Sequence, residues 1–103
     1  MIVSIHANSY VEEEVCGAQV FYFKGSEGGK LLADSIQNNI SEVSVLNNKR
    51  VAKANSDYYL LRNVTAPAVI VECGFLSNVQ EAALLKNSEY QRKIAWSIHL
   101  GIM

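Results

Sequence analysis

The chain has 103 residues, of which 50% are hydrophobic, and its 9 lysine and arginine residues nearly balance its 10 aspartate and glutamate residues. This length and composition allow one small domain with a packed core. The balanced charge excludes the broad basic surface of a nucleic-acid-binding protein, and no apolar run reaches the roughly 18 residues that a membrane-spanning helix needs.

The N-terminal part of the chain predicts two strands. Met1 to Ser4 is apolar and β-branched, which predicts a strand that ends near His6. The acidic run from Glu12 to Glu14 is typical of a solvated loop. After this loop, the aromatic and branched residues between Gly17 and Phe23 predict the second strand.

A helix is predicted after the second strand. Ser26 can cap a helix that runs to about Ile40, in which Leu32, Ile36 and Ile40 recur at the spacing of one buried face. Residues 41–50 are polar and predict a connection.

The middle of the chain predicts a helical turn followed by two strands. Val51 to Ser56 is expected to form the turn, and Tyr58 to Arg62 is expected to form the third strand. Pro67 fits at the start of a strand but not within its ladder, so the next strand begins after it. Ala68 to Cys73 is apolar except for Glu72, which is typical of a strand buried on both faces of a parallel sheet.

Two helices are predicted at the C-terminus. Asn78 and Glu81 have the spacing of a capping box at the start of a helix from Val79 to Leu85. Ser88 can cap the last helix. The expected buried face of that helix consists of Ile94, Ala95, Ile98 and Ile102. Strands that alternate with helices predict an α/β fold with an open, mainly parallel sheet and helices on both faces, in a single domain over residues 1–103.

The cysteines and the start of the chain give two further expectations. Cys16 and Cys73 form no CxxC pair and are too few for a disulfide framework, so we expect two free thiols. Cys73 lies in an apolar run and is expected to be a small buried hydrophobe. No charged start followed by an apolar stretch and a cleavage site is visible, so the sequence shows no signal peptide.

Glu72 is the strongest candidate for chemistry. A carboxylate near the end of a buried strand costs free energy unless it has a partner or a function. One interpretation is an ion pair with a lysine or arginine. The other interpretation is a catalytic group, because ligand sites of open α/β sheets lie at the carboxyl ends of strands.

His6 is the second candidate. If its strand runs parallel to that of Glu72, both residues reach the same edge of the sheet. Together they suit metal-assisted hydrolysis, in which zinc acidifies a water and a carboxylate moves its proton. A lone histidine is otherwise a structural hydrogen-bonding residue. His99, on the last helix, has no ligand-like spacing and is expected to have a surface or packing role.

Two polar residues could contact a substrate. Arg62 could bind a carboxylate through two hydrogen bonds, or it could pair with Glu72 or another acid. Asn8 follows His6 by two residues, where it could position a substrate or form a turn.

These segments together resemble a known family. The chain contains, in order, SIHAN at Ser4–Asn8, GAQVFYF, KRVAKANSDYYLLRN, PAVIVECGFLSN at Pro67–Asn78 and EAALLKNSEYQRKIAWSIHLGI. This order is similar to the C-terminal part of the zinc-dependent N-acetylmuramoyl-L-alanine amidases of bacteria, which include spore-cortex and cell-separation enzymes. SIHAN and VECGFLSN are specific in combination, whereas either motif alone is a weak signal.

The resemblance implies an open α/β fold and hydrolysis of the amide between muramic acid and L-alanine in peptidoglycan, outside the cytoplasm. His6 matches a zinc ligand of the family, and Glu72 matches its catalytic glutamate. Asn8 and Arg62 remain candidates for substrate binding.

The resemblance also implies an incomplete site. In the family, a histidine followed by two glycines and a later glutamate precede the segment that matches this chain, so only one of three zinc ligands is present. We therefore expect the chain alone to be inactive, with an exposed sheet edge that associates with itself or with an N-terminal complementing segment. The alternative is a non-catalytic module that binds peptidoglycan or regulates another protein.

Overall fold

The computed structural model describes residues 1–43 and 48–103 of the chain. Its elements, in order, are β1 (Ile2–Asn8), β2 (Gln19–Phe23), α1 (Glu27–Val43), β3 (Lys53–Asn55), α2 (Tyr59–Arg62), β4 (Ala68–Phe75), α3 (Val79–Lys86) and α4 (Ser88–Ile102). One open sheet contains the four strands in the order β1-β4-β2-β3. The pairs β1–β4 and β2–β3 are parallel, and the pair β4–β2 is antiparallel.

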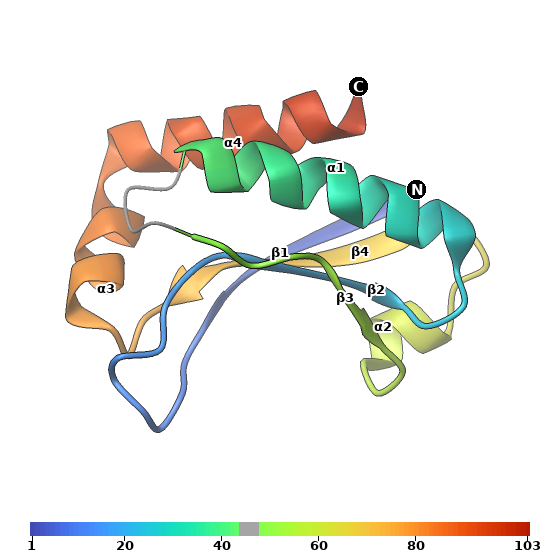
Figure 1. The fold of residues 1–103 in the computed structure, drawn as a ribbon, viewed down its shortest axis with the longest axis horizontal. Helices are drawn as coiled ribbons and strands as arrows, with labels where there is room; N and C mark the ends of the chain where they lie inside the picture. The colour runs from blue at the N-terminus through green and yellow to red at the C-terminus, as the bar shows by residue number, and fades with distance from the viewer. Residues whose placement is uncertain (44–47) are drawn as a thin grey trace.

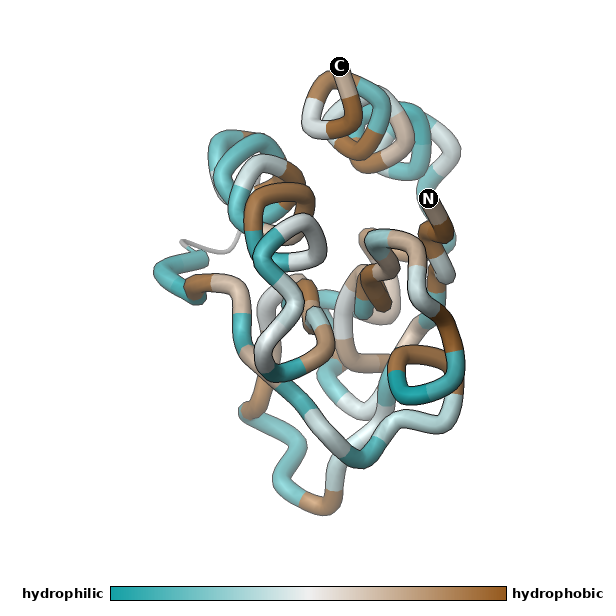
Figure 2. Tube along the Cα trace, turned by 90° about the vertical axis from the view of Figure 1, so that its right-hand side faces the viewer, coloured by the Kyte–Doolittle hydropathy of each residue, from teal (hydrophilic) through white to brown (hydrophobic). Residues whose placement is uncertain are grey.

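Helices cover both faces of this sheet, and the predicted α/β class is therefore correct (Figure 1). The helices α1 and α4 lie over one face, and the short helix α2 lies against the other. Figure 2 shows the apolar positions of α1 and α4 on their inner sides. Within the described residues, no helix is both long and apolar enough to cross a membrane.

The central strand β4 separates two cores. Each of its eight residues is buried, as the largely apolar run from Ala68 to Cys73 predicted. Side chains alternate along a strand, so Val69, Val71 and Cys73 pack toward α1 and α4, whereas Ala68 and Ile70 pack toward α2. The predicted burial of Cys73 is confirmed, and both cysteines are free thiols.

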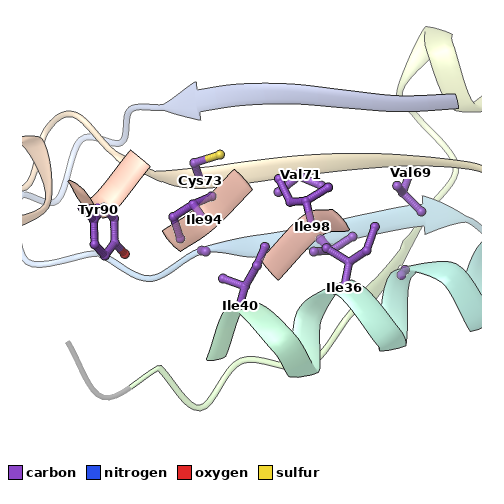
Figure 3. Packing of buried hydrophobic residues seen from close by; sticks show 11 residues of the cluster. Ile36, Ile40, Val69, Val71, Cys73, Tyr90, Ile94 and Ile98 are labelled. Atoms are coloured by element: carbon purple, nitrogen blue, oxygen red, sulfur yellow. The ribbon is translucent and has the colours of Figure 1, made fainter. Parts of the chain in front are cut away.

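The larger core lies between the sheet and the pair α1 and α4 (Figure 3). Ile94 and Ile98 of α4 are buried as predicted, but Ala95 and Ile102 are exposed. Ser97 and Gly101 take their places on the inner face of α4. A side chain at position 101 would clash, since its Cβ would lie 2.7 Å from the Cα of Ile36 in α1.

Two predictions for the middle of the chain are wrong. The expected helical turn at residues 51–56 instead contains β3, which pairs with β2 at the edge of the sheet. The expected strand Tyr58–Arg62 is instead the single-turn helix α2. The Asn55 side chain explains the change of direction, because its Oδ1 accepts the N–H groups of Asp57 and Tyr58 at 2.8 and 3.0 Å.

The predicted ends of the other elements are mostly correct. Strand β1 continues past His6 to Asn8, and α1 extends to Val43. The Ser26 hydroxyl accepts the N–H of Gly29, which fits its predicted role as a cap. The polar connection predicted at residues 41–50 is in part helical, and its positions 44–47 lie outside the described residues.

The caps of the last two helices are both asparagines. The Asn78 side chain accepts the N–H of Glu81 at the start of α3, as predicted. The cap of α4 is Asn87 rather than Ser88, because Asn87 Oδ1 accepts the N–H of Tyr90. Ser88 is already the first residue of the helix, so its predicted capping role is wrong by one position.

Candidate active site

His6 and Glu72 are direct neighbours across two parallel strands. The register pairs His6 of β1 with Glu72 of β4. Residues two positions apart on a strand share a face, so Ser4 and His6 lie beside Ile70 and Glu72 on the α2 side of the sheet. The strands continue to Asn8 and Phe75, so the pair lies on the sheet face near the carboxyl ends of the strands rather than beyond them.

These side chains line a cavity of about 400 Å³ between the sheet and α2. The residues of β1 and β4 form its floor on the sheet. The residue before α2 and the first residues of α2 form the opposite wall. The lining residues are Ser4, His6, Tyr58, Tyr59, Leu60, Ile70 and Glu72. A cavity of this size, mainly apolar with a few converging polar groups, has the usual features of a ligand site.

The Glu72 side chain is buried and has no hydrogen-bond partner among the described residues. The residue is 6% exposed, and its Oε2 atom is both buried and unpartnered there. Among the described residues the only ion pair joins Lys30 and Asp34, so the alternative of a structural ion pair to Glu72 is not supported. Burial raises the pKa of Glu72, and the nearby His6 opposes part of that increase. The site thus holds a carboxyl group with a high proton affinity.

His6 is exposed, and a neighbour on the same strand orients it. The Ser4 hydroxyl lies 2.7 Å from Nε2 of His6. The other ring nitrogen, Nδ1, makes no hydrogen bond to the described residues. A histidine whose one nitrogen is held by a polar neighbour can present the other nitrogen to a metal ion.

The described residues do not complete a zinc site. Nowhere in residues 1–43 and 48–103 do three histidine, cysteine, aspartate or glutamate side chains come close enough to hold a metal ion. A catalytic zinc site normally has three protein ligands. His6 fits the role of one ligand, but Cys73 packs toward the opposite face of the sheet. His99 is exposed on α4, where it contacts Trp96, in agreement with the predicted surface role.

The two candidate substrate-binding residues lie outside the cavity. Arg62 is exposed at the end of α2 and forms no ion pair with Glu72. Asn8 forms a local turn, since its Oδ1 accepts the N–H of Ser9 at 2.8 Å. Its backbone carbonyl accepts the N–H of Leu76 at 2.7 Å, which ties the end of β1 to the segment after β4.

A second buried carboxylate, Glu81, was not predicted from the sequence. Glu81 is 2% exposed, and its two oxygens both lie within hydrogen-bonding distance of the Gly17 N–H, at 2.9 and 3.0 Å. Its Oε1 also accepts the N–H of Phe75 at 2.7 Å. Glu81 therefore joins the loop before β2 to the end of β4, instead of bonding back to Asn78 as in a capping box.

The acidic loop between β1 and β2 is held against this end of the sheet. Glu12, Glu13 and Glu14 are exposed, as predicted. The Asn78 side chain donates to the carbonyl of Glu13, and the guanidinium of Arg50 donates to the carbonyl of Cys16. The capping-box spacing was the only sequence signal for this network, and it indicated the helix start rather than the loop.

Comparison with known proteins identifies the family. The family profile of the N-acetylmuramoyl-L-alanine amidases matches residues 1–103. The germination-specific N-acetylmuramoyl-L-alanine amidase of Bacillus subtilis is 37% identical over 107 residues, which are 100% of this chain and 43% of that protein. An uncharacterized cell wall amidase of Bacillus anthracis is 28% identical over 111 residues, which are 100% of this chain and 20% of that protein.

A solved structure supports the same assignment. The CwlD amidase of Clostridioides difficile, in complex with the GerS lipoprotein, is 44% identical with a TM-score of 0.93, and the match covers 97% of this chain and 51% of that chain. The chain belongs to the N-acetylmuramoyl-L-alanine amidase family, which confirms the resemblance found in the sequence. It spans about half the length of the Bacillus subtilis amidase and of the CwlD chain.

Proposed function

We propose that the chain carries the histidine–glutamate part of a peptidoglycan amidase site and acts on the amide between N-acetylmuramic acid and L-alanine. The observation that carries this proposal is the register of β1 and β4, which places His6 opposite a buried Glu72 with an unpartnered oxygen. Membership in the amidase family supports the choice of reaction. The cell wall is accordingly the proposed place of action.

Glu72 is the proposed general base and acid. It takes a proton from the attacking water as the water oxygen bonds to the lactyl carbonyl carbon. It then gives that proton to the alanine nitrogen as the carbon–nitrogen bond breaks, which yields a lactyl carboxyl group and a free amino group. A carboxyl group whose pKa is raised by burial suits both steps, because it is a stronger base than an exposed one.

His6 is the proposed zinc ligand of this chain. A zinc ion in such a site polarises the carbonyl group and acidifies water. The remaining ligands are proposed to come from outside these residues, since the described side chains offer no set of three donors. We therefore propose that the isolated chain is inactive and that a complementing N-terminal segment restores activity.

The edge of the sheet supports association with such a segment. Strand β1 is an edge strand, and its Ile5 is 59% exposed. Beside Ile5, an apolar groove of about 180 Å³ lies between β1 and α4 and includes Cys73, Ile94 and Ile98 in its lining. An apolar edge of this kind recruits another chain. Sedimentation should detect self-association of the isolated chain, and a stable monomer would contradict this proposal.

A complementation experiment tests the enzymatic proposal. The chain is mixed with the part of the Bacillus subtilis relative that lies outside the match, and new alanine amino groups released from purified peptidoglycan are measured with added zinc. We expect activity only in the mixture. His6→Ala should abolish zinc binding, whereas Glu72→Gln should keep zinc and lose activity. Activity in the Glu72→Gln mixture would show that the proposed role of Glu72 is wrong.

The alternative function is a non-catalytic module that binds peptidoglycan or regulates another protein. The incomplete set of metal donors among the described residues favours it. The complementation experiment distinguishes the two, because the module should bind intact peptidoglycan but should restore no hydrolysis in the mixture. The CwlD relative is in complex with a lipoprotein, so a protein partner is also proposed for this chain.

A further inference from the structure

The wall of the cavity that faces Glu72 consists largely of aromatic residues. Tyr58 and Tyr59 lie at the start of α2 and line the same cavity of about 400 Å³ as His6 and Glu72. Burial raises the pKa of the Tyr58 phenol, and the Glu72 carboxylate raises it further, which agrees with their place in one cavity. No function assigned above uses either tyrosine.

The backbone and the core hold Tyr58 in place. Its N–H donates to Asn55 Oδ1, and its carbonyl accepts the N–H groups of Leu61 and Arg62 at 3.1 Å each. Its ring contacts Phe21 edge to face, with 5.4 Å between the ring centroids. The buried Leu61 fixes α2 to the sheet. The wall is therefore formed before any ligand binds.

Tyr59 presents its ring to solvent beside this fixed position. It is 75% exposed, so it contributes little to the core. Single exposed aromatic residues are common, and Tyr10 is one on this chain. Tyr59 differs from Tyr10 because it lines the cavity that contains Glu72. A rigid aromatic side chain with a polar tip is well suited to contact a ligand that is apolar on one face and hydroxylated at its rim.

We propose that Tyr58 and Tyr59 bind the saccharide ring of the muramoyl group, so that the scissile amide lies over Glu72. This inference rests on the proposed function. A pyranose ring offers C–H groups on one face and hydroxyl groups at its rim. The peptide part of the substrate carries carboxylates, which the wall does not match, since no lysine or arginine lines the cavity.

A pair of probes separates the saccharide from the peptide. N-acetylmuramoyl-L-alanyl-D-isoglutamine contains the sugar, whereas L-alanyl-D-isoglutamine lacks it. Their binding to the 103-residue chain is measured by NMR titration in the Glu72→Gln background, which prevents hydrolysis. We expect tighter binding of the muramoyl probe. Tyr59→Ala should weaken that binding about fivefold and leave the peptide probe unchanged.

Two controls accompany the wall variant. Tyr59→Phe keeps the ring and should keep most of the affinity. Tyr10→Ala removes another exposed tyrosine, which lies outside the cavity, and should change nothing. Three results would overturn the inference. The affinity for the muramoyl probe could be unchanged in Tyr59→Ala, the affinity for both probes could fall equally, or the chain could fail to bind the muramoyl probe at all. If only the proposed function is wrong, the muramoyl probe still binds more tightly than the peptide probe. The complemented mixture, however, does not hydrolyse peptidoglycan.

Discussion

The hydroxyl oxygen of Ser4 lies 2.7 Å from Nε2 of His6, two residues further along the same edge strand. Both side chains lie on the α2 side of the sheet because residues two apart on a strand share a face. The contact holds one nitrogen of the ring and leaves Nδ1 without a hydrogen bond to the described residues. The strand thus fixes the orientation of the His6 ring.

The first prediction concerns this contact. If the Ser4 hydroxyl oxygen accepts a hydrogen bond from the Nε2–H group of His6, the neutral ring carries its proton on Nε2. Long-range proton–nitrogen NMR at about pH 8.5, where histidine is ordinarily neutral, should then show this one tautomer. Ser4→Ala should produce a mixture of tautomers at His6. His99 is the internal control and should not change, and a single unaltered tautomer in the variant would argue against the role of Ser4.

The second prediction follows from the buried Glu72. Its raised pKa means that the folded chain binds this proton more tightly than the unfolded chain. Stability therefore falls as pH rises from the ordinary carboxyl value through the raised one. Glu72→Gln lacks this loss, so its stability relative to wild type should increase as the pH rises above the ordinary carboxyl pKa. Urea unfolding across this range measures the difference.

The control for this variant is Glu14→Gln in the exposed loop between β1 and β2. Its unfolding free energy should follow that of the wild type at every pH. If the curves of Glu72→Gln and wild type also run parallel, the Glu72 carboxyl group is not destabilised by burial.

The third prediction separates the two cysteines by reactivity. Burial, and to a lesser extent Glu72, raises the pKa of Cys73 to about 11. At pH 8 only about one Cys73 in a thousand is then the reactive thiolate. In the folded chain a thiol reagent should modify Cys16 first, and Cys73 should react only after denaturation. Cys73→Ser should remove only the modification that follows denaturation. Rapid modification of both thiols in the folded wild type would contradict the prediction.

The fourth prediction concerns the hydrogen bonds of Glu81. Glu81→Gln replaces one carboxylate oxygen by an NH2 group, which cannot accept a hydrogen bond. It also removes the negative charge that strengthens the bonds from the Gly17 and Phe75 N–H groups. We expect a loss of about 2 kcal/mol in unfolding free energy. Hydrogen exchange should accelerate at both Gly17 and Phe75. Glu13→Gln is the matched control in the exposed loop, and protection of both amides in Glu81→Gln would refute the assignment.

The fifth prediction concerns the close approach of α1 and α4. A Cβ at position 101 would lie 2.7 Å from the Cα and 2.9 Å from the backbone nitrogen of Ile36, and neither backbone atom can move alone. Gly101→Ala should cost about 1–3 kcal/mol, although alanine is the better helix former. Thermal unfolding measures this loss. Leu100→Ala on the exposed side of α4 should have a much smaller effect.

Local patterns were sufficient to predict much of the fold and the central pair of the site. The apolar run after Pro67 predicted β4 because a strand buried on both faces needs apolar residues at nearly every position. Glu72 was recognisable because it interrupts that run. His6 was recognisable as a histidine at the end of an apolar segment, although no pattern in the sequence showed that β1 and β4 are neighbours.

The tertiary structure decided the remaining features, because they depend on residues far apart in the chain. Residues 53–55 form a strand because they pair with β2. Tyr59–Arg62 form a helix because the Asn55 side chain accepts the N–H of Tyr58 and changes the direction of the backbone. Glu81 is buried because Gly17, 64 positions away, donates a hydrogen bond to it. The sequence by itself determined which residues are candidates for the chemistry, because it fixes the type of each side chain. Strand pairing and hydrogen bonds between distant residues decided which of the candidates meet in one cavity.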